Sequence, residues 1–358
     1  MASLRNTREA LLLGYSEGWL DEMEFLALYD LNTSENLEFP YDSYDQFNLD
    51  DIDEAECIAE FRFEKRHILQ LEEVLQIPAL LKCDQRSVFT GTEGLCLLLK
   101  RLAYPCRYSD LIYRFGRPVP VLCMITNKVI DCIYDTHHRK ITNWNNGILN
   151  PVSLQMYADA ISAKGAALDN CFGFIDGTVR AISKPGERQR VMYNGHKRIH
   201  GIKFQSVTLP NGLIANMYGP VEGRKHDASM LTESGLLREL QRNAISPTGQ
   251  PLCVYGDPAY PLRVHLQGPF KNAYLTPQMQ QFNKSMSEVR ISVEWLFNDI
   301  INYFKFMDFK KNLKVGLSSV GKMYIVSGLL RNALTCLYGN STSKFFDIQP
   351  PSLEDYFA

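Results

Sequence analysis

The sequence of 358 residues contains no run of 18 apolar residues and therefore no candidate membrane-spanning helix. Its nine cysteines are scattered, without a Cys-x-x-Cys pair or a Cys/His cluster at zinc-ligand spacing. The odd number of cysteines and the absence of a secretory start predict an intracellular protein with reduced, mostly buried thiols. Internal repeats and low-complexity tracts are also absent, which excludes solenoid and fibrous classes.

Positive charge is missing from one long stretch of the chain. Between Asp21 and Glu60 there is no Lys or Arg, and there are about 14 Asp and Glu. The whole chain has 38 Lys and Arg against 40 Asp and Glu, so the remainder carries a net charge of about +12. A basic body with an acidic N-terminal segment fits phosphate binding, although a solvated acidic surface would give the same pattern.

Composition and periodicity divide the chain into four parts. Residues 1–60 form an acidic N-terminal segment, with an extended linker expected over residues 30–55. Residues 61–150 have helical patterning, whereas residues 151–338 alternate between strand and helix patterns. The C-terminal tail, residues 339–358, mixes apolar and acidic side chains. It could bind a partner or a second protomer, or it could pack on its own domain.

The helical part contains a candidate helix-turn-helix unit. Ser109 is the expected N-cap of a short helix that ends at Gly116, and the basic cluster at 137–140 could contact phosphate. A small helical bundle that only packs on the catalytic domain remains the alternative. Helices are expected over residues 1–20, 67–77, 92–102, 110–115 and 121–134.

The part from residue 151 predicts an α/β domain with a mixed sheet flanked by helices. Pro210-Asn211-Gly212 between two strand-like runs indicates a hairpin. Strands are expected over 171–175, 201–209, 213–218 and 252–256, and helices over 228–243 and 283–306.

Four acidic residues in this part are candidates for one divalent-metal site. Asp176 and Asp257 end apolar strand-like runs, where ligands of α/β sheets collect. Asp227 opens a helix, so it could equally be a helix cap, and Glu294 lies inside a long helix. A helix cap, turn or surface charge explains any one of them alone. Because Mg²⁺ prefers oxygen ligands and assists phosphoryl transfer, the set predicts a metal-dependent nuclease or strand transferase.

A group of basic residues lies between the acids and predicts a DNA-binding rim beside them. A solvated charged face is the alternative, and three lysines after the long helix, at 310, 311 and 314, could extend the rim. The rim consists of Lys184, Arg188, Arg190, His196, Lys197, Arg198, Lys203, Arg224 and Lys225.

The acids and their neighbours resemble a known family. Ile175-Asp176-Gly177-Thr178, His226-Asp227, the run from Gly256 to Pro261, and the segment from Phe282 to Glu294 occur in the order of the PIF/Harbinger superfamily transposases, which carry a DDE endonuclease domain. The resemblance covers about residues 67–335. Each piece alone is unspecific, but the ordered set is specific. The segments 221–225 and 298–302 depart from the pattern, which puts DNA contacts in doubt but not the acids.

The resemblance implies an RNase H-like fold, preceded by a helix-turn-helix region, and a DNA transposase that cleaves and joins DNA. Asp176, Asp257 and Glu294 would be catalytic and would hold two Mg²⁺ or Mn²⁺ ions, with Asp227 as a further metal ligand. The implied partners are double-stranded DNA (transposon ends and target), a Myb/SANT-like DNA-binding protein and further copies of the chain. The implied location is the nucleus, or the cytoplasm without that partner. The alternatives are a domesticated DNA-binding adaptor without catalysis and a nuclease without strand transfer.

Overall fold

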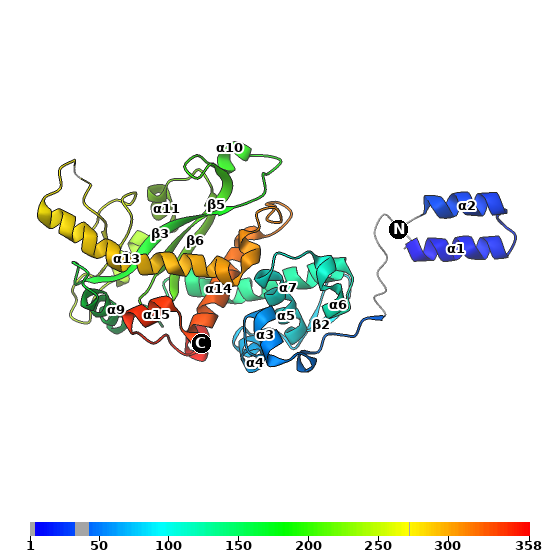
Figure 1. Cartoon of the computed structure of the whole chain (residues 1–358), viewed down its shortest axis with the longest axis horizontal. Helices are drawn as coiled ribbons and strands as arrows, with labels where there is room; N and C mark the ends of the chain where they lie inside the picture. Colours follow the sequence, from blue (N-terminus) through cyan, green and yellow to red (C-terminus); the bar gives the residue numbers. More distant parts are fainter. Residues whose placement is uncertain (1–3, 33–42, 272) are drawn as a thin grey trace.

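The computed structural model describes residues 4–32, 43–271 and 273–358, apart from the side chains of residues 4–6 and 292–297. The chain begins with two paired helices, α1 (Leu4–Ser16) and α2 (Glu22–Leu31), which lie apart from the rest of the described chain (Figure 1). The rings of Tyr15 and Phe25 stack between them at 4.8 Å. The first helix confirms the sequence-based expectation, whereas the second was not expected.

The next part is helical, as predicted. Its first α-helix, α3, precedes the predicted helical region and was not expected; it begins after Asp53, whose carboxylate accepts a hydrogen bond from the backbone N–H of Glu56 at 3.0 Å. A small antiparallel hairpin, β1–β2, interrupts the helices and was not predicted. The elements are η2 (Leu49–Asp51), α3 (Glu54–Phe61), α4 (Lys65–Val74), β1 (Leu80–Lys82), β2 (Val88–Thr90), α5 (Gly91–Ala103), η3 (Tyr108–Leu111), α6 (Ile112–Phe115), α7 (Val119–His137) and α8 (Arg139–Thr142).

The expected short helix after Ser109 needs a correction. The chain enters it through the 3₁₀ turn η3, which Arg107 precedes, and the Asp110 carboxylate accepts a hydrogen bond from the backbone N–H of Arg107 at 2.7 Å. Ser109 therefore lies inside the turn and is not its cap. Gly116 ends α6 in the left-handed region, with φ 59°, as predicted. The helix-turn-helix interpretation remains a prediction.

A six-stranded mixed sheet follows, which confirms the predicted fold class at the level of a mixed α/β domain. The strand order is β4-β5-β3-β7-β8, and β6 also pairs with β5. The central strand β3 is antiparallel to β5 and parallel to β7, which is in turn parallel to β8. The strands are β3 (Cys171–Ala181), β4 (Tyr193–Asn194), β5 (Ile199–Thr208), β6 (Ile214–Glu222), β7 (Cys253–Tyr255) and β8 (Leu266–Gln267).

Strand β3 is longer than predicted. It does not end at Asp176 but continues to Ala181, because β5 pairs with it from Phe174 to the end. Asp is a weak strand former, so the sequence pattern stops there, while the backbone ladder with β5 carries the strand on. Asp176 consequently sits inside a strand, opposite Ser206.

Helices flank this sheet (Figure 1). The helix predicted over 228–243 is two helices, because Gly235 at φ 69° separates them. Helices α9 and α13 contact β3, α14 contacts β6, and α11 contacts β5 and β6. The elements are α9 (Pro151–Ala163), α10 (Gln189–Met192), α11 (Asp227–Ser234), α12 (Leu236–Asn243), α13 (Pro277–Tyr303), η4 (Lys305–Asp308), α14 (Val320–Tyr338), α15 (Ser341–Phe346) and α16 (Leu353–Phe357).

The C-terminal tail packs on its own chain, which confirms that alternative. Tyr356 and Phe357 are buried, and the Tyr356 hydroxyl accepts a hydrogen bond from the Asn332 side chain of α14 at 2.7 Å. The same Asn332 bonds the backbone N–H and C=O of Ile214, each at 2.9 Å. The tail, α14 and the sheet are therefore joined by one buried polar network.

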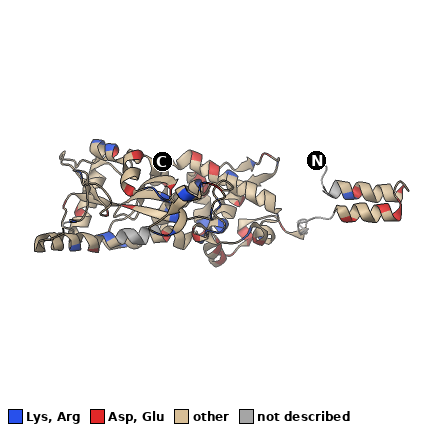
Figure 2. Cartoon of the chain, turned by 90° about the horizontal axis from the view of Figure 1, so that it is seen from above, with Lys and Arg blue, Asp and Glu red and all other residues tan. Residues whose placement is uncertain are grey.

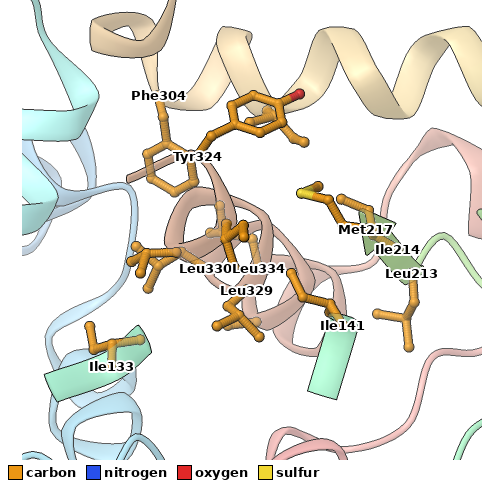
Figure 3. Close-up of a cluster of buried hydrophobic side chains, with 14 of the residues drawn as sticks. Ile133, Ile141, Leu213, Ile214, Met217, Phe304, Tyr324, Leu329, Leu330 and Leu334 are labelled. Atoms are coloured by element: carbon orange, nitrogen blue, oxygen red, sulfur yellow. The ribbon is translucent and has the colours of Figure 1, made fainter. Parts of the chain in front are cut away.

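Helix α14 lies at the centre of the core (Figure 3). Leu329, Leu330 and Leu334 are buried on it, and it contacts both α7 of the helical part and β6 of the sheet. At Gly328 an added Cβ would meet Met217 at 3.1 Å and Ile141 at 3.4 Å, so the helix approaches both neighbours closely. The nine cysteines are free and are buried or half-buried, as predicted. In the described part of the chain, no helix is long and apolar enough to cross a membrane.

Candidate active site

Asp176 and Asp257 come from neighbouring parallel strands at the same level. Phe174 of β3 is paired with Tyr255 of β7, and each aspartate follows its paired residue by two positions. Because strand side chains alternate with a period of two, Asp176 shares the face of Phe174, while Asp257 lies in the turn just past the end of β7. Neighbouring strands are about 4.8 Å apart, so the two carboxylates emerge close together at this point of the sheet.

The Asp176 carboxylate is half-buried and held from two sides. One oxygen, Oδ1, accepts a hydrogen bond from the backbone N–H of Gly177 at 2.8 Å. The other, Oδ2, lies 3.2 Å from the guanidinium of Arg290 on α13, and both side chains are 21% exposed. Burial raises the pKa of Asp176, and the nearby Asp257 and Asp227 raise it further, while Arg290 and Gly177 oppose the rise. A carboxyl group with a raised pKa among other acids is typical of a functional site.

Asp257 lies in a tight turn directly after β7. Its Oδ1 accepts a hydrogen bond from the backbone N–H of Ala259 at 2.9 Å, which fixes the turn through Pro258. Gly256 is required for close packing there, since an added Cβ would meet Ile175 at 2.8 Å and Tyr260 at 2.9 Å. The turn therefore packs Tyr260 against Gly256 and keeps Asp257 close enough to Asp176 to raise the pKa of Asp176.

Tyr260 is a site residue that the sequence argument missed. It is 3% exposed, and its hydroxyl has no hydrogen-bond partner among the described atoms. Burial raises the pKa of Tyr260, and Asp227, Asp176 and Asp257 raise it further. A buried hydroxyl without a partner is rare and calls for an explanation, which a bound water or ligand would give. One hint of this role was present in the sequence, the position of Tyr260 three residues after Asp257.

Asp227 begins helix α11 but does not cap it. His226 is the N-cap, and the Asp227 carboxylate instead lies 2.7 Å from the buried ammonium of Lys203. That ammonium also donates to the backbone C=O of Lys225 at 2.8 Å. At Gly177 an added Cβ would collide with the Asp227 carboxylate, so only a glycine lets it approach the strand so closely. Asp227 is thus near Asp176, but its charge is already neutralised by Lys203.

The third proposed catalytic acid, Glu294, belongs to α13, one helical turn beyond Arg290. Its side chain lies outside the described part of the structure, so its role stays a prediction. Arg290 was noted from the sequence only as a neighbour of Glu294 on that helix, and its ion pair with Asp176 was not foreseen. The pair holds α13 against the central strand β3 at Asp176.

The donor set suits a hard divalent cation only in part. Among the described side chains there is no group of three or more His, Cys, Asp or Glu that could hold a metal ion. Asp176 and Asp257 offer carboxylate oxygens beside an unpartnered buried hydroxyl, which fits Mg²⁺ or Mn²⁺. Asp227 fits poorly, because Lys203 occupies one of its oxygens.

The predicted DNA-binding residues fall into two groups. Lys203 and Lys225 form ion pairs within the protein, with Asp227 at 2.7 Å and with Glu233 at 2.6 Å. The other members of the rim are exposed and have no ion pair with a described acid. In Figure 2, Lys and Arg lie on the strands and loops of the body, and acidic residues are prominent on α1 and α2. The exposed members are Lys184, Arg188, Arg190, His196, Lys197, Arg198 and Arg224.

Comparison with known proteins gives one family match. No curated protein and no solved structure matches the chain. Residues 175–332 match the family model described as DDE superfamily endonuclease, a span that runs from the residue before Asp176 to Asn332 on α14. The match contains all four candidate acids, and it supports the assignment of this part of the chain to a transposase-like nuclease family.

Proposed function

We propose that the chain is a DNA transposase of the PIF/Harbinger superfamily, which cleaves DNA and joins the freed end to a target. The observation that carries the proposal is the placement of Asp176 and Asp257 at one level of neighbouring parallel strands, inside the segment that matches a DDE endonuclease. The raised pKa of Asp176 agrees with a functional carboxyl group there.

The strand arrangement supports an RNase H-like fold for this domain. Three antiparallel strands in chain order, β3, β5 and β6, are followed by β7 and β8, and these two lie parallel to β3 on its other side. The first of these five strands, β3, carries Asp176, and Asp257 follows the end of the fourth, β7, in agreement with the family resemblance. A preceding helix-turn-helix region is proposed for residues 61–150.

Each residue of the site has a distinct proposed part. Asp176 and Asp257 would hold two Mg²⁺ or Mn²⁺ ions with Glu294, and such ions supply an activated water and stabilise the leaving oxygen. Arg290 orients Asp176 through its ion pair, and its position beside the acids suits contact with a phosphate oxygen. Asp227 keeps Lys203 buried and supports the strand, so we assign it a structural part before a metal-binding one.

The remaining parts of the proposal concern partners. The exposed basic rim would bind double-stranded DNA of the transposon ends and the target. A Myb/SANT-like DNA-binding protein and further copies of this chain are the proposed protein partners, and the nucleus is the proposed location. These follow from the family resemblance.

The first experiment tests cleavage with single acid variants. Asp176→Asn and Asp257→Asn should each lower nicking of supercoiled plasmid with Mg²⁺ or Mn²⁺ by roughly 100-fold or more, while DNA binding persists. Asp159→Asn, an exposed acid on α9, is the matched control and should cut like the parent. Cutting that survives both site variants would refute the site.

The same preparation separates the two alternatives. A parent protein that binds DNA but does not cut it with either cation is an adaptor and contradicts the proposal. Cleavage without joined products, when a second labelled duplex is supplied as a target, identifies a nuclease without strand transfer.

A further inference from the structure

A small basic pocket lies at the far end of β3 from the acids. We define the basic pocket by Lys184, Arg198, His200, Lys310 and Lys311, and its volume is about 300 Å³. The first three residues flank the β3–β5 connection, and the two lysines follow η4, more than a hundred positions later. No sequence motif joins these segments, so the fold alone creates the pocket.

Backbone hydrogen bonds hold the two segments together. The N–H of Ile182 donates to the C=O of His200 at 2.9 Å, and the N–H of Ser183 donates to the C=O of Leu313 at 3.0 Å. Leu313 is fully buried, which anchors the lysine-bearing loop from below. The pocket is therefore built by paired main chain and a buried anchor, and not by the chance position of mobile side chains.

The charges in the basic pocket are unbalanced. Its lining contains two lysines from one segment and a lysine and an arginine from the other, but no Asp or Glu. None of these four cations forms an ion pair with an acid in the described part of the chain. Two buried cations of the fold are paired instead, Lys203 with Asp227 and Arg331 with Asp299. Like charges gathered without a counter-charge repel each other, so the pocket favours a bound anion.

The position of the basic pocket indicates which anion. From Asp176 to Ser183 is seven residues, which at about 3.3 Å per residue places the pocket roughly 23 Å along the strand direction from the acids. DNA has one phosphate per about 3.4 Å of axis on each strand, so this span equals about seven base pairs. A single duplex can therefore reach both places, and the exposed Arg188, Arg190 and Lys197 lie on the connection between β3 and β5.

We propose that the basic pocket binds a backbone phosphate of duplex DNA about seven base pairs from the phosphodiester that reacts at Asp176 and Asp257. The proposal rests on the proposed action on DNA, but it concerns binding and not cutting. Its contacts go to phosphate, so the site positions the duplex and does not read its sequence.

The test is the salt dependence of DNA binding, measured by fluorescence anisotropy on the full chain in EDTA, so that no cleavage is needed. The slope of log K against log salt concentration is negative, and each lost phosphate contact reduces its magnitude by about 0.9. Because the basic pocket holds one phosphate, Lys310→Ala/Lys311→Ala should reduce the magnitude of the slope by up to about 0.9, equally for duplexes of unrelated sequence. Lys164→Ala/Lys344→Ala removes the same charge from exposed lysines outside the basic pocket and the proposed helix-turn-helix region, and should leave the slope unchanged.

The outcomes separate this inference from the proposed function. Both lysines of the test pair are exposed, so the variant should keep the melting temperature of the parent, which a thermal scan verifies. A lower slope in the test pair alone supports the pocket, even for a protein that cuts no DNA. An unchanged slope, or an equal loss in the control pair, overturns the pocket and leaves the cleavage proposal standing.

Discussion

At the scale of single residues, the contact between Gly177 and Asp227 makes a sharp prediction. A methyl group at position 177 would collide with the Asp227 carboxylate, although the backbone angles of Gly177 do not require glycine. Gly177→Ala should therefore displace Asp227 from Lys203 and lower the free energy of unfolding by about 1–3 kcal/mol. Urea unfolding of the single variant measures this cost.

The double variant provides the control for that prediction. When Asp227 is already Ala, the added methyl group has no carboxylate to meet, so Gly177→Ala should cost much less in that background. The difference between the two costs is the coupling energy of the pair. Equal costs in both backgrounds would mean that Gly177 is needed for another reason.

Some residues of the candidate site could be predicted from the sequence, and others could not. Asp176 and Asp257 could be predicted because each follows an apolar strand-like run and has a glycine as its direct neighbour. Tyr260 and the pairing of Arg290 with Asp176 were not found, because their roles depend on the packing of α13 and the turn after β7. The pairing of Lys203 with Asp227 was likewise hidden, since their separation of 24 residues has no local pattern.

At the scale of elements, an ion pair joins α13 to α14. Arg331 of α14 is only 1% exposed in its side chain, and its guanidinium lies 2.7 Å from the Asp299 carboxylate of α13, which is 23% exposed. Helix α13 carries Arg290 and Glu294, so this pair holds the element that completes the site.

Because Arg331 is more deeply buried than Asp299, removing one or the other partner should lower the free energy of unfolding by different amounts. Asp299→Ala leaves a buried guanidinium without a counter-charge and should cost about 3–5 kcal/mol of unfolding free energy. Arg331→Met leaves a carboxylate that water can reach, and its apolar chain fills the buried space, so it should cost less than half as much. Chemical denaturation of both variants decides the order, and a reversed order would contradict the burial argument.

The ends of helices and strands were predicted correctly where nearby residues determine them. The predictions failed where pairing with a distant strand determines them. The hairpin at Asn211-Gly212 and the end of α6 at Gly116 follow from residues that turns and helix ends require. The extension of β3 to Ala181 depends on β5, and the β1–β2 hairpin consists of two strands of three residues each, too short for a visible alternation. Helix α3 was not predicted, although Asp53 and Glu56 have the spacing of a helix start.

At the scale of the whole molecule, the sequence divides the chain near residue 150, whereas the buried core is continuous across that position. One cluster of buried apolar residues includes Ile133 and Ile141 of the helical part together with Ile214 and Met217 of the sheet, with α14 between them (Figure 3). The family match begins only at residue 175 and ends within α14. We therefore expect residues 43–358 to unfold as one cooperative unit, to which the preceding α1–α2 pair does not belong.

Leu330→Ala tests this expectation. Leu330 is fully buried on α14, so its truncation should cost about 2–5 kcal/mol. In one cooperative unit that cost lowers amide protection equally in α5 of the helical part and in β5 of the sheet, as hydrogen exchange followed by mass spectrometry would show. Leu31→Ala on α2, where the side chain is 80% exposed, is the control and should change neither. A loss of protection in β5 alone would instead establish two independent units with a boundary near residue 150.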